Sequence, residues 1–354
     1  MPSTMRAVLL TGHGGLDRLE VVQRHPCPSP AAGEVLVRVG ACAINATDVN
    51  TRVGWYARDD DNGAWDEPLR FPRVQGADVC GEVVAVGQSL PAATLAPALA
   101  VGDRVMVDPW LRNRDHPERL DGCGYVGSEI DGGYAEYLVV PMENAHPVHA
   151  ALSDAELASF ATSSGTALNM LERVGLRAGE TVLVTGASGG VGTALVHIAR
   201  LFGATVVAVT TAEKAERVLA EGAHVVLDRA QPLAPQLSAA RGARTVDVVA
   251  DVVGGAQWGE AIDLLRRGGR YVVSGALAGA VVPLDLRTLY LNDLTMFGAT
   301  VMPPGLFARL VGMVERGELA PSIAAIYRFS EVRQAHEAFA RKEHVGKLIL
   351  RGWE

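Results

Sequence analysis

Short apolar or alternating runs dominate the first 150 residues, and glycine, proline or aspartate bounds each of them. The runs read RAVLL, LEVV, EVLVRVGACAI, CGEVVAVG, DRVMVDP and AEYLVV. Short runs of this kind, separated by turn-forming residues, are typical of β-strands. The first part of the chain is therefore predicted to be a β-rich domain.

From residue 181 the pattern changes to an alternation of strand, turn and helix. TVLVTG is followed by the helical ASGGVGTALVHIARLFG, then by ATVVAVT, the helical AEKAERVLAEG, and AHVVLD. VDVVADVVGG and GRYVVSGA continue the series, and LYLNDLTMFGATV supplies its last strand. Strands that alternate with helices of this length predict a parallel sheet.

The end of the chain returns to the β-rich pattern. FSEVRQAHEAFARKE predicts a helix, and KLILR predicts a strand that rejoins the first domain. A chain of 354 residues is long enough for two domains. We expect one domain over residues 1–155 and 300–354, and the other over residues 156–299. DDDNGAWDEPLRFPR and SLPAATLAPALAVGD are expected to be long loops.

Composition and charge exclude several classes of function. The chain is 49% hydrophobic and 20% charged, without an apolar run of about 18 residues, so no membrane partner is expected. The apolar stretch near the N-terminus, AVLL, is too short for a signal peptide, which predicts a cytoplasmic protein. A net charge of −8 with scattered basic residues argues against nucleic acid as a partner. The cysteines form no C-x-x-C pair and are expected to be reduced thiols; they are Cys27, Cys42, Cys80 and Cys123.

The stretch VLVTGASGGVG, residues 182–192, follows an apolar strand and opens a helix. In that context a glycine-rich turn indicates a site where backbone N–H groups meet a pyrophosphate. Against the pattern G-x-G-x-x-G, Gly189 and Gly192 fit, whereas Ala187 replaces the first glycine. The alternative is a tight turn without a ligand. The predicted phosphate contacts are Gly186, Ala187, Ser188, Gly189, Gly190, Val191 and Gly192.

The residues after the next strand indicate which dinucleotide is bound. An acidic residue at the strand end would bind the ribose of NAD, but ATVVAVTTAEK ends in Thr210 and Thr211, with Lys214 shortly after. Hydroxyl groups and a cation suit a 2′-phosphate, so NADPH is the predicted cofactor. Glu213 is the competing candidate for an NAD acid. Arg229 either reaches the phosphate or lies on the surface.

Residues 44–56, INATDVNTRVGWY, crowd short polar side chains before Trp55 and Tyr56, without histidine or cysteine. Asp48 is expected to cap a turn or helix. If this stretch is a reaction site, its chemistry does not use a metal ligand. The polar residues are Asn45, Thr47, Asp48, Asn50 and Thr51.

The whole chain resembles the medium-chain dehydrogenase/reductase superfamily. The resemblance rests on AGEVLVRVGACAIN, GADVCGEVVAVG, VGDRVMV, DGGYAEYLVVP, VTGASGGVG and VGKLILR, and it covers nearly the entire sequence. It implies an α/β fold, with a β-rich GroES-like catalytic domain and a Rossmann domain with a doubly wound parallel sheet. It also implies a homodimer in which the strand near LYLNDLTMFGATV pairs across a two-fold axis.

The zinc ligands of the alcohol dehydrogenases in this superfamily are replaced here. Their positions look like Asn45, Ala77 and Thr162, and the lobe that holds structural zinc in those enzymes keeps only Cys123. The chain is therefore similar to the zinc-independent, quinone oxidoreductase-like branch, and no metal is predicted. A different metal site is conceivable in the lobe, although a solvated loop is favoured; its ligands would be Asp108, Asp115, His116 and Cys123.

The resemblance also assigns roles to individual residues. Tyr56 lies where enoyl-thioester reductases with a similar I-N-x-x-D run carry their proton-donating tyrosine, so it is the candidate general acid; the alternative is a pocket-wall aromatic. Asn45 is the candidate that holds the nicotinamide or the substrate carbonyl. Further predicted cofactor contacts are Thr166, Val253, Ser274, Gly275, Ala276, Phe297 and Lys347.

Together these features predict an NADPH-dependent oxidoreductase acting on a small molecule, either a quinone or an activated carbon–carbon double bond. A 2-enoyl thioester reductase is the first alternative. The acidic ARDDDNGAWDE loop disfavours it, whereas Arg52, Arg70 and Arg73 favour it. The second alternative is a non-catalytic NADPH-binding redox sensor.

Overall fold

The protein is described by a computed structural model over residues 2–57, 69–88 and 98–353, in which the chain forms two compact units. Unit 1 comprises Met1–Thr162, Phe307–Gly317 and Ile323–Glu354, and unit 2 comprises Ser163–Leu306 and Glu318–Ser322. Most of the two predicted long loops lies outside the described residues. The domain limits expected from the sequence, residues 1–155 with 300–354 and residues 156–299, stay a prediction.

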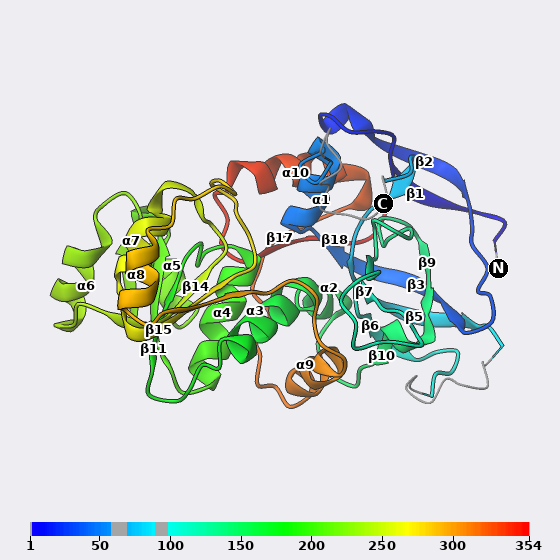
Figure 1. Cartoon of the computed structure of the whole chain (residues 1–354). Coiled ribbons are helices and arrows are strands. Elements are labelled where there is room, and N and C mark those ends of the chain that lie inside the picture. The colour runs from blue at the N-terminus through cyan, green and yellow to red at the C-terminus, as the bar shows by residue number, and fades with distance from the viewer. Residues whose placement is uncertain (1, 58–68, 89–97, 354) are drawn as a thin grey trace. The chain divides into compact units, whose positions relative to one another are not determined.

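Unit 1 is rich in β-structure, as its alternating sequence pattern predicted (Figure 1). Its strands are β1 (Thr4–Leu10), β2 (Leu19–Pro26), β3 (Glu34–Ala43), β4 (Arg73–Val74), β5 (Asp78–Val86), β6 (Arg104–Val107), β7 (Trp110–Leu111), β8 (Gly124–Tyr125), β9 (Tyr137–Pro141), β10 (Ala145–Pro147), β17 (Ile323–Tyr327) and β18 (Lys347–Leu350). The largest sheet has seven strands in the order β10-β6-β5-β3-β18-β17, with β9 also paired to β3. A three-stranded sheet has the order β2-β1-β4, and β7 pairs with β8.

The last strand of the chain is built into this sheet. β18 runs antiparallel to β3, with Ile349 opposite Ala43 and Leu350 opposite Cys42. All four residues of β18 are buried, so the strand is held by apolar packing on both faces as well as by its hydrogen bonds. The predicted return of KLILR to the first domain is confirmed.

Helices of unit 1 flank its sheets and close its core. They are α1 (Ala46–Val53), α2 (Asp154–Ala158), α9 (Leu306–Glu315), α10 (Val332–Arg341) and the 3-10 turns η1 (Leu16–Arg18), η2 (Met142–Asn144) and η5 (Phe329–Glu331). α10 turns Val332, Ala335 and His336 inward, while its other residues are mostly exposed. This amphipathic pattern explains why FSEVRQAHEAFARKE could be assigned as a helix from the sequence.

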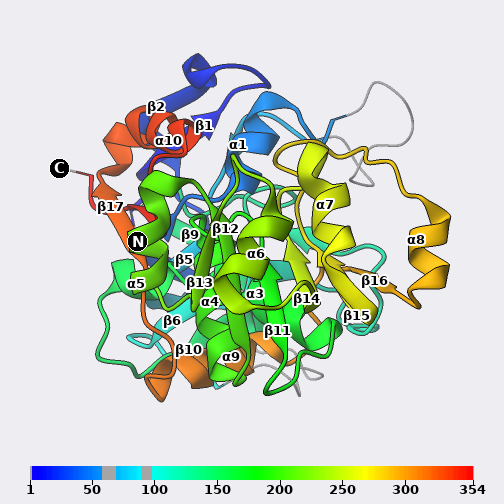
Figure 2. The same cartoon turned by 90° about the vertical axis from the view of Figure 1, so that its left-hand side faces the viewer.

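Unit 2 is a doubly wound parallel sheet, as predicted. Its strands are β11 (Thr181–Val184), β12 (Thr205–Thr210), β13 (Val225–Asp228), β14 (Val246–Asp251), β15 (Leu265–Val273) and β16 (Thr295–Gly298). Their order, β13-β12-β11-β14-β15-β16, is that of the Rossmann fold, and every pair is parallel. These strands are labelled in Figure 2. The predicted final strand near LYLNDLTMFGATV is β16, at one edge of the sheet.

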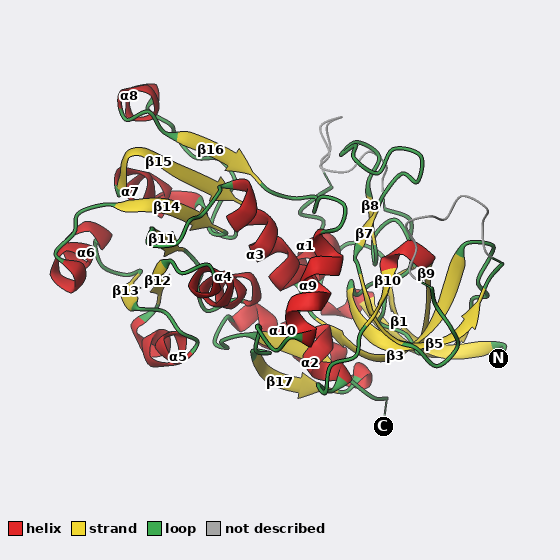
Figure 3. Ribbon diagram, turned by 90° about the horizontal axis from the view of Figure 1, so that it is seen from below, coloured by secondary structure: helices red, strands yellow, loops and turns green. Residues whose placement is uncertain are grey.

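Helices cover both faces of this sheet (Figure 3). They are α3 (Ala161–Arg173), α4 (Gly190–Leu201), α5 (Ala215–Ala220), α6 (Leu233–Arg241), α7 (Trp258–Asp263), α8 (Leu286–Leu291) and the 3-10 turns η3 (Ala212–Lys214) and η4 (Gly255–Gln257). α3, α4 and α5 lie on one face, and α6 and α7 on the other. Burial on both faces explains the nearly continuous valine and leucine runs of these strands.

None of the helices within the described parts of the chain combines the length and the apolar character that crossing a bilayer requires.

Candidate active site

The glycine-rich turn joins β11 to α4 in unit 2. Gly186 has a left-handed backbone, with φ of 59°, and Gly189 is the residue before the first turn of α4. A Cβ on Gly192 would lie 2.1 Å from the carbonyl oxygen of Gly186, so only glycine allows the helix to approach the turn this closely. Ala187 is fully buried, and its N–H donates to Val209 O. The turn has the form of a dinucleotide phosphate site.

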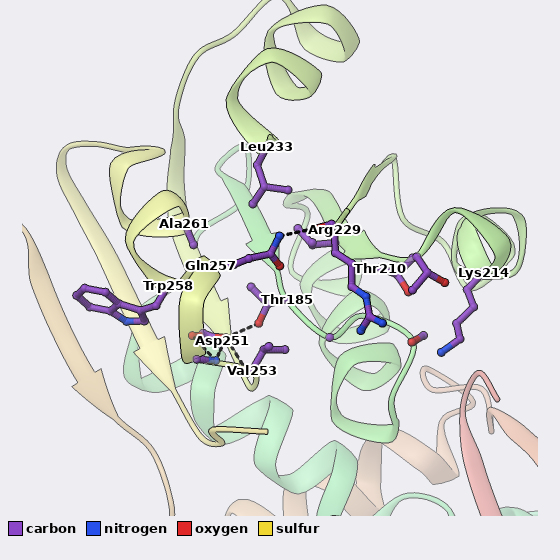
Figure 4. Close-up of a pocket in the computed structure, with 15 residues that line it drawn as sticks. Thr185, Thr210, Lys214, Arg229, Leu233, Asp251, Val253, Gln257, Trp258 and Ala261 are labelled. Atoms are coloured by element: carbon purple, nitrogen blue, oxygen red, sulfur yellow. Dashed lines mark hydrogen bonds between the residues drawn. The ribbon is translucent and has the colours of Figure 1, made fainter. Parts of the chain in front are cut away.

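A pocket opens beside this turn at the carboxyl ends of the strands (Figure 4). Its walls include seven of the predicted cofactor residues, brought together from four separate stretches of sequence. These are Gly186, Ser188, Thr210, Thr211, Lys214, Arg229 and Val253. A crevice at this edge of an open parallel sheet is where such folds bind their ligands.

Thr210 and Arg229 are adjacent in the pocket wall, since the Arg229 N–H donates to Thr210 O at 2.7 Å. The side chains of Arg229 and Lys214 extend into the same open space (Figure 4). Glu213, the candidate for an acid that binds the ribose of NAD, is exposed. Hydrogen bonds from its own N–H and from the Thr211 hydroxyl lower the pKa of its carboxyl, and Arg229 and Lys214 have smaller effects. The pocket wall itself thus presents two cations and two hydroxyl groups.

Sequence reasoning missed a buried carboxylate under this pocket. Asp251, at the end of β14 and 1% exposed, accepts hydrogen bonds from the Thr185 hydroxyl, the Tyr271 hydroxyl and the N–H groups of Val253 and Gly254. These bonds fix the turn that carries Val253. The available signal was its place at the carboxyl end of a buried parallel strand.

The other predicted cofactor residues of unit 2 lie outside the first pocket. Gly275, Ala276 and Phe297 line a second cavity, which shares Gly254 and Trp258 with the first. The remaining ones are Ser274, whose N–H donates to Asp251 O, half-buried Thr166 on α3, and Gly189, Gly190 and Val191 at the start of α4.

In unit 1 the structure brings Asn45 and Lys347 together. Lys347, at the start of β18 and 4% exposed, donates from Nζ to Asn45 Oδ1 and, at 3.0 Å, to Asp78 Oδ2. Asp78 is fully buried, and its other oxygen accepts the Thr162 N–H at 2.7 Å. Lys347 is the buried counter-ion of Asp78. The contact with the cofactor that the resemblance implies for Lys347 stays a prediction.

The three positions that the resemblance predicts to replace zinc ligands contact this ion pair or precede it in the chain. Asn45 and Thr162 are linked to it directly, and Ala77 precedes Asp78 in the chain. The Thr162 hydroxyl is 2.7 Å from the hydroxyl of buried Tyr125. Burial, with a smaller effect of Asp78, raises the pKa of Tyr125 well above its usual range.

Asp48 caps α1, as predicted. Its carboxylate accepts the Asn45 N–H at 2.8 Å and the Gly76 N–H at 3.2 Å. The pKa of Asp48 is raised to about 6, and burial is the largest cause. The Asn45 N–H lowers this pKa, Asp78 raises it, and Lys347 and the Tyr134 hydroxyl have smaller lowering effects. Asp48 thus holds the start of α1, which Asn45 directly precedes.

Tyr56 is half-buried beyond the end of α1. Asn50 Nδ2 donates to its hydroxyl oxygen at 3.4 Å, and its ring meets Trp55 edge to face, with centroids 4.9 Å apart. Tyr56 also contributes to the raised pKa of Tyr125, which places the two phenols in one neighbourhood. Trp55 is 49% exposed.

Metal-ligating side chains do not gather anywhere in the described part of the chain: no three of His, Cys, Asp and Glu are placed to hold an ion. Asp108, one of the four residues considered for a different metal site, accepts hydrogen bonds from the Trp110 N–H and from the Arg112 side chain. The four cysteines are free; Cys42 and Cys80 are buried, and Cys27 and Cys123 are partly exposed.

Comparison with known families matches two models to the chain. Residues 31–150 match the alcohol dehydrogenase GroES-like domain, and residues 190–316 match the zinc-binding dehydrogenase model. A crystal structure from Sinorhizobium meliloti 1021, provisionally named an alcohol dehydrogenase, is 46% identical with a TM-score of 0.92, and the match covers 99% of this chain and 98% of that one.

Two characterised relatives are similar over almost their whole length. A quinone oxidoreductase of Lama guanicoe is 29% identical over 354 residues, covering 98% of this chain and 97% of the relative. An acryloyl-coenzyme A reductase of Metallosphaera sedula is 28% identical over 356 residues, covering 98% of this chain and 99% of the relative.

Proposed function

Since this chain belongs to the medium-chain dehydrogenase/reductase superfamily, in its quinone oxidoreductase-like branch, we propose that it is an NADPH-dependent enzyme that needs no metal. Its substrate would be a quinone or the activated double bond of an α,β-unsaturated carbonyl. The family consists of oxidoreductases that bind nicotinamide dinucleotides and act on small molecules.

The observation that carries the proposal is the wall of the dinucleotide pocket. Lys214 and Arg229 supply two cations beside the hydroxyls of Thr210 and Thr211, a set that suits a 2′-phosphate. Of the residues described around this pocket, the one carboxylate is Asp251, whose oxygens already accept protein hydrogen bonds. A ribose 2′-hydroxyl would therefore find no free acid in this wall, which supports NADPH over NADH.

When bound, NADPH supplies a hydride to an electron-poor carbon of the substrate. The chain must then stabilise the negative charge that develops on the substrate oxygen, and deliver a proton. A single well-placed donor at such an oxygen is worth about 100-fold to 1,000-fold in rate. We assign the donor role to the Asn45 amide and the proton delivery to Tyr56. The glycine-rich turn would hold the pyrophosphate through its N–H groups.

A 2-enoyl thioester reductase is the second candidate, favoured by the similarity to the acryloyl-coenzyme A reductase. Arg52 and Arg73, which favour the thioester in the sequence, contact other residues of unit 1. Arg52 is buried and donates to Gly14 O at 2.8 Å, and Arg73 pairs with Asp131 at 3.0 Å. Arg70 is exposed, and nearly all of the acidic loop that argued against the thioester lies outside the described residues.

The test is to follow the oxidation of NADPH and of NADH, with and without a chelator, while offering a small quinone, a 2-enone and a 2-enoyl-CoA in parallel. We expect faster oxidation of NADPH, turnover of the quinone or the enone, and no effect of the chelator. Loss of activity to the chelator would refute metal independence. If NADPH binds but is not oxidised with any of the three acceptors, the non-catalytic redox sensor would be favoured.

A further inference from the structure

The amide of Asn45 is held in one orientation by Lys347. An ammonium group can donate hydrogen bonds but cannot accept them, so the amide atom that faces Lys347 Nζ must be the oxygen. The Nδ2 group is thereby turned away from the ion pair. Both residues are at least nine-tenths buried, since Asn45 is 6% exposed and Lys347 is 4% exposed.

The Nδ2 group so placed has no acceptor. It is buried, and none of the residues that the structure describes accepts a hydrogen bond from it. A buried donor without a partner costs free energy, and native proteins keep few of them. The unpartnered Nδ2 group lies beside the Lys347–Asp78 ion pair, whose burial also costs free energy. We take this to indicate that a ligand atom supplies the missing acceptor.

We propose that Lys347 is a positioning residue that presents the Nδ2–H donor group of Asn45 to a carbonyl oxygen of the bound ligand. This inference rests on the proposed function, which offers two such oxygens: that of the substrate carbonyl and that of the nicotinamide carboxamide. Lys347 itself touches neither ligand. It acts only indirectly, by fixing which side of the neutral Asn45 amide is the donor.

Neighbouring contacts make the orientation rigid. Asp78 holds Lys347 at 3.0 Å and is itself held by the Thr162 N–H at 2.7 Å. On the other side, the Asn45 N–H donates to Asp48 at 2.8 Å, which fixes the backbone from which the amide projects. Without Lys347 the amide could rotate by half a turn and present Oδ1, an acceptor, to the ligand.

A double-variant cycle tests whether Lys347 acts through Asn45. Asn45→Ala and Lys347→Met are each expected to lower kcat/KM by about 10-fold to 1,000-fold, and the double variant should be no worse than Asn45→Ala alone. Lys347→Arg keeps a buried charged donor and should restore much of the activity. If the two losses multiply, Lys347 acts independently of Asn45 and the proposal is wrong.

Lys347→Met leaves Asp78 charged and unpaired, and that alone can prevent folding. Lys347→Met combined with Asp78→Asn removes both charges and is the second form of the same test. Thermal unfolding of every variant separates a general loss of structure from the expected change in kinetics.

A readout that does not depend on turnover is the side-chain amide signal of Asn45. The chain has seven asparagines, so a protein labelled with 15N-asparagine gives a simple spectrum, in which Asn45→Ala identifies the signal. A shift on adding NADPH alone assigns the carboxamide, and a shift that needs NADP⁺ with a 2-enone assigns the substrate carbonyl. In Lys347→Met this shift should be reduced or lost.

The two proposals can fail separately. The proposed function is refuted if the wild-type chain does not oxidise NADPH with any of the acceptors offered. Even then, an Asn45 signal that moves when NADPH or NADH is added would support the positioning role. If fluorescence shows the cofactor bound and neither NADPH nor NADP⁺ with the enone moves the signal, Asn45 donates to no ligand and the inference is refuted.

Discussion

Gly192 packs against Gly186 so closely that a Cβ at residue 192 would meet the carbonyl oxygen of Gly186 at 2.1 Å and the Cα of Ala187 at 2.6 Å. Both obstacles are backbone atoms, which cannot rotate away as a side chain can. The approach of α4 to the end of β11 therefore depends on the absence of a side chain at this position. The start of α4 and the phosphate turn keep their relative position through this contact.

Gly192→Ala should consequently lower both stability and dinucleotide affinity. Forcing extra atoms into a packed site costs about 1–3 kcal/mol, and the shifted turn should weaken NADPH binding by at least about tenfold. Chemical unfolding and a fluorescence titration with NADPH measure the two effects. Gly189→Ala is the matched control for stability, because its Cβ would have its nearest neighbour at 3.6 Å. Equal unfolding free energies in the two variants would contradict the packing argument.

Lys214 and Arg229 should determine the choice of dinucleotide. Replacing either with alanine removes a charge-assisted hydrogen bond worth about 1.5–3 kcal/mol, so the Kd for NADPH should rise about 10-fold to 100-fold. The Kd for NADH should stay nearly the same, since NADH lacks the 2′-phosphate. Arg217, an exposed cation on α5 that does not line the pocket, provides the control variant Arg217→Ala. A parallel loss of NADH affinity would argue that these residues serve the fold instead.

Tyr56→Phe should lower kcat while leaving NADPH affinity unchanged. General acid catalysis contributes about 100-fold to 10,000-fold, and this much activity should be lost if the Tyr56 hydroxyl delivers the proton. Tyr125→Phe is the matched control, because it removes a neighbouring phenol that is engaged with the Thr162 hydroxyl. Steady-state rates with the preferred acceptor and a cofactor titration give the two readouts. Unchanged turnover in Tyr56→Phe would reduce this residue to a pocket-wall aromatic.

Asp48 should make the protein less stable as the pH rises from about 4 to 6. Its pKa is about 6 in the folded chain, against 3.8 for an ordinary aspartate, so between these values the folded state binds more protons than the unfolded state. A difference of about two units corresponds to a loss of up to about 3 kcal/mol across this window. The free energy of unfolding, measured against pH, should fall less steeply in Asp48→Asn than in the wild type. Parallel curves for the two proteins would refute a raised pKa.

We expect a homodimer formed through the edge of the unit 2 sheet that ends in β16. Apolar side chains are exposed in this part of the chain: Leu286 by 66%, Tyr290 by 63% and Leu291 by 55%. Exposed apolar groups near an edge strand are typical of an interface. Light scattering should give the mass of a dimer, and Leu286→Glu with Tyr290→Glu should give a monomer. Ile326→Glu in unit 1, at a side chain 52% exposed, should leave the mass unchanged.

The local pattern of the sequence was sufficient to predict most of the longer helices and strands. The longer strands of unit 1, the alternation in unit 2 and the glycine turn at residues 186–192 were predicted, because period, turn residues and helix starts are properties of neighbouring residues. The strands β4, β7, β8, β10 and β17 and the helices α2, α6, α7, α8 and α9 were missed. In such short segments apolar spacing is a weak signal, and packing against the rest of the unit decides the conformation.

The sequence by itself therefore determined the longer elements, the glycine-rich turn and the candidate residues Asn45, Tyr56, Lys214 and Arg229. Only the tertiary structure decided which distant residues contact one another around the site. Lys347 reaches Asp78 across 269 positions of sequence and Asn45 across 302, and Asp251 meets Thr185 across 66. No local pattern encodes such pairings, because buried charges and amides find partners only when distant strands are packed side by side.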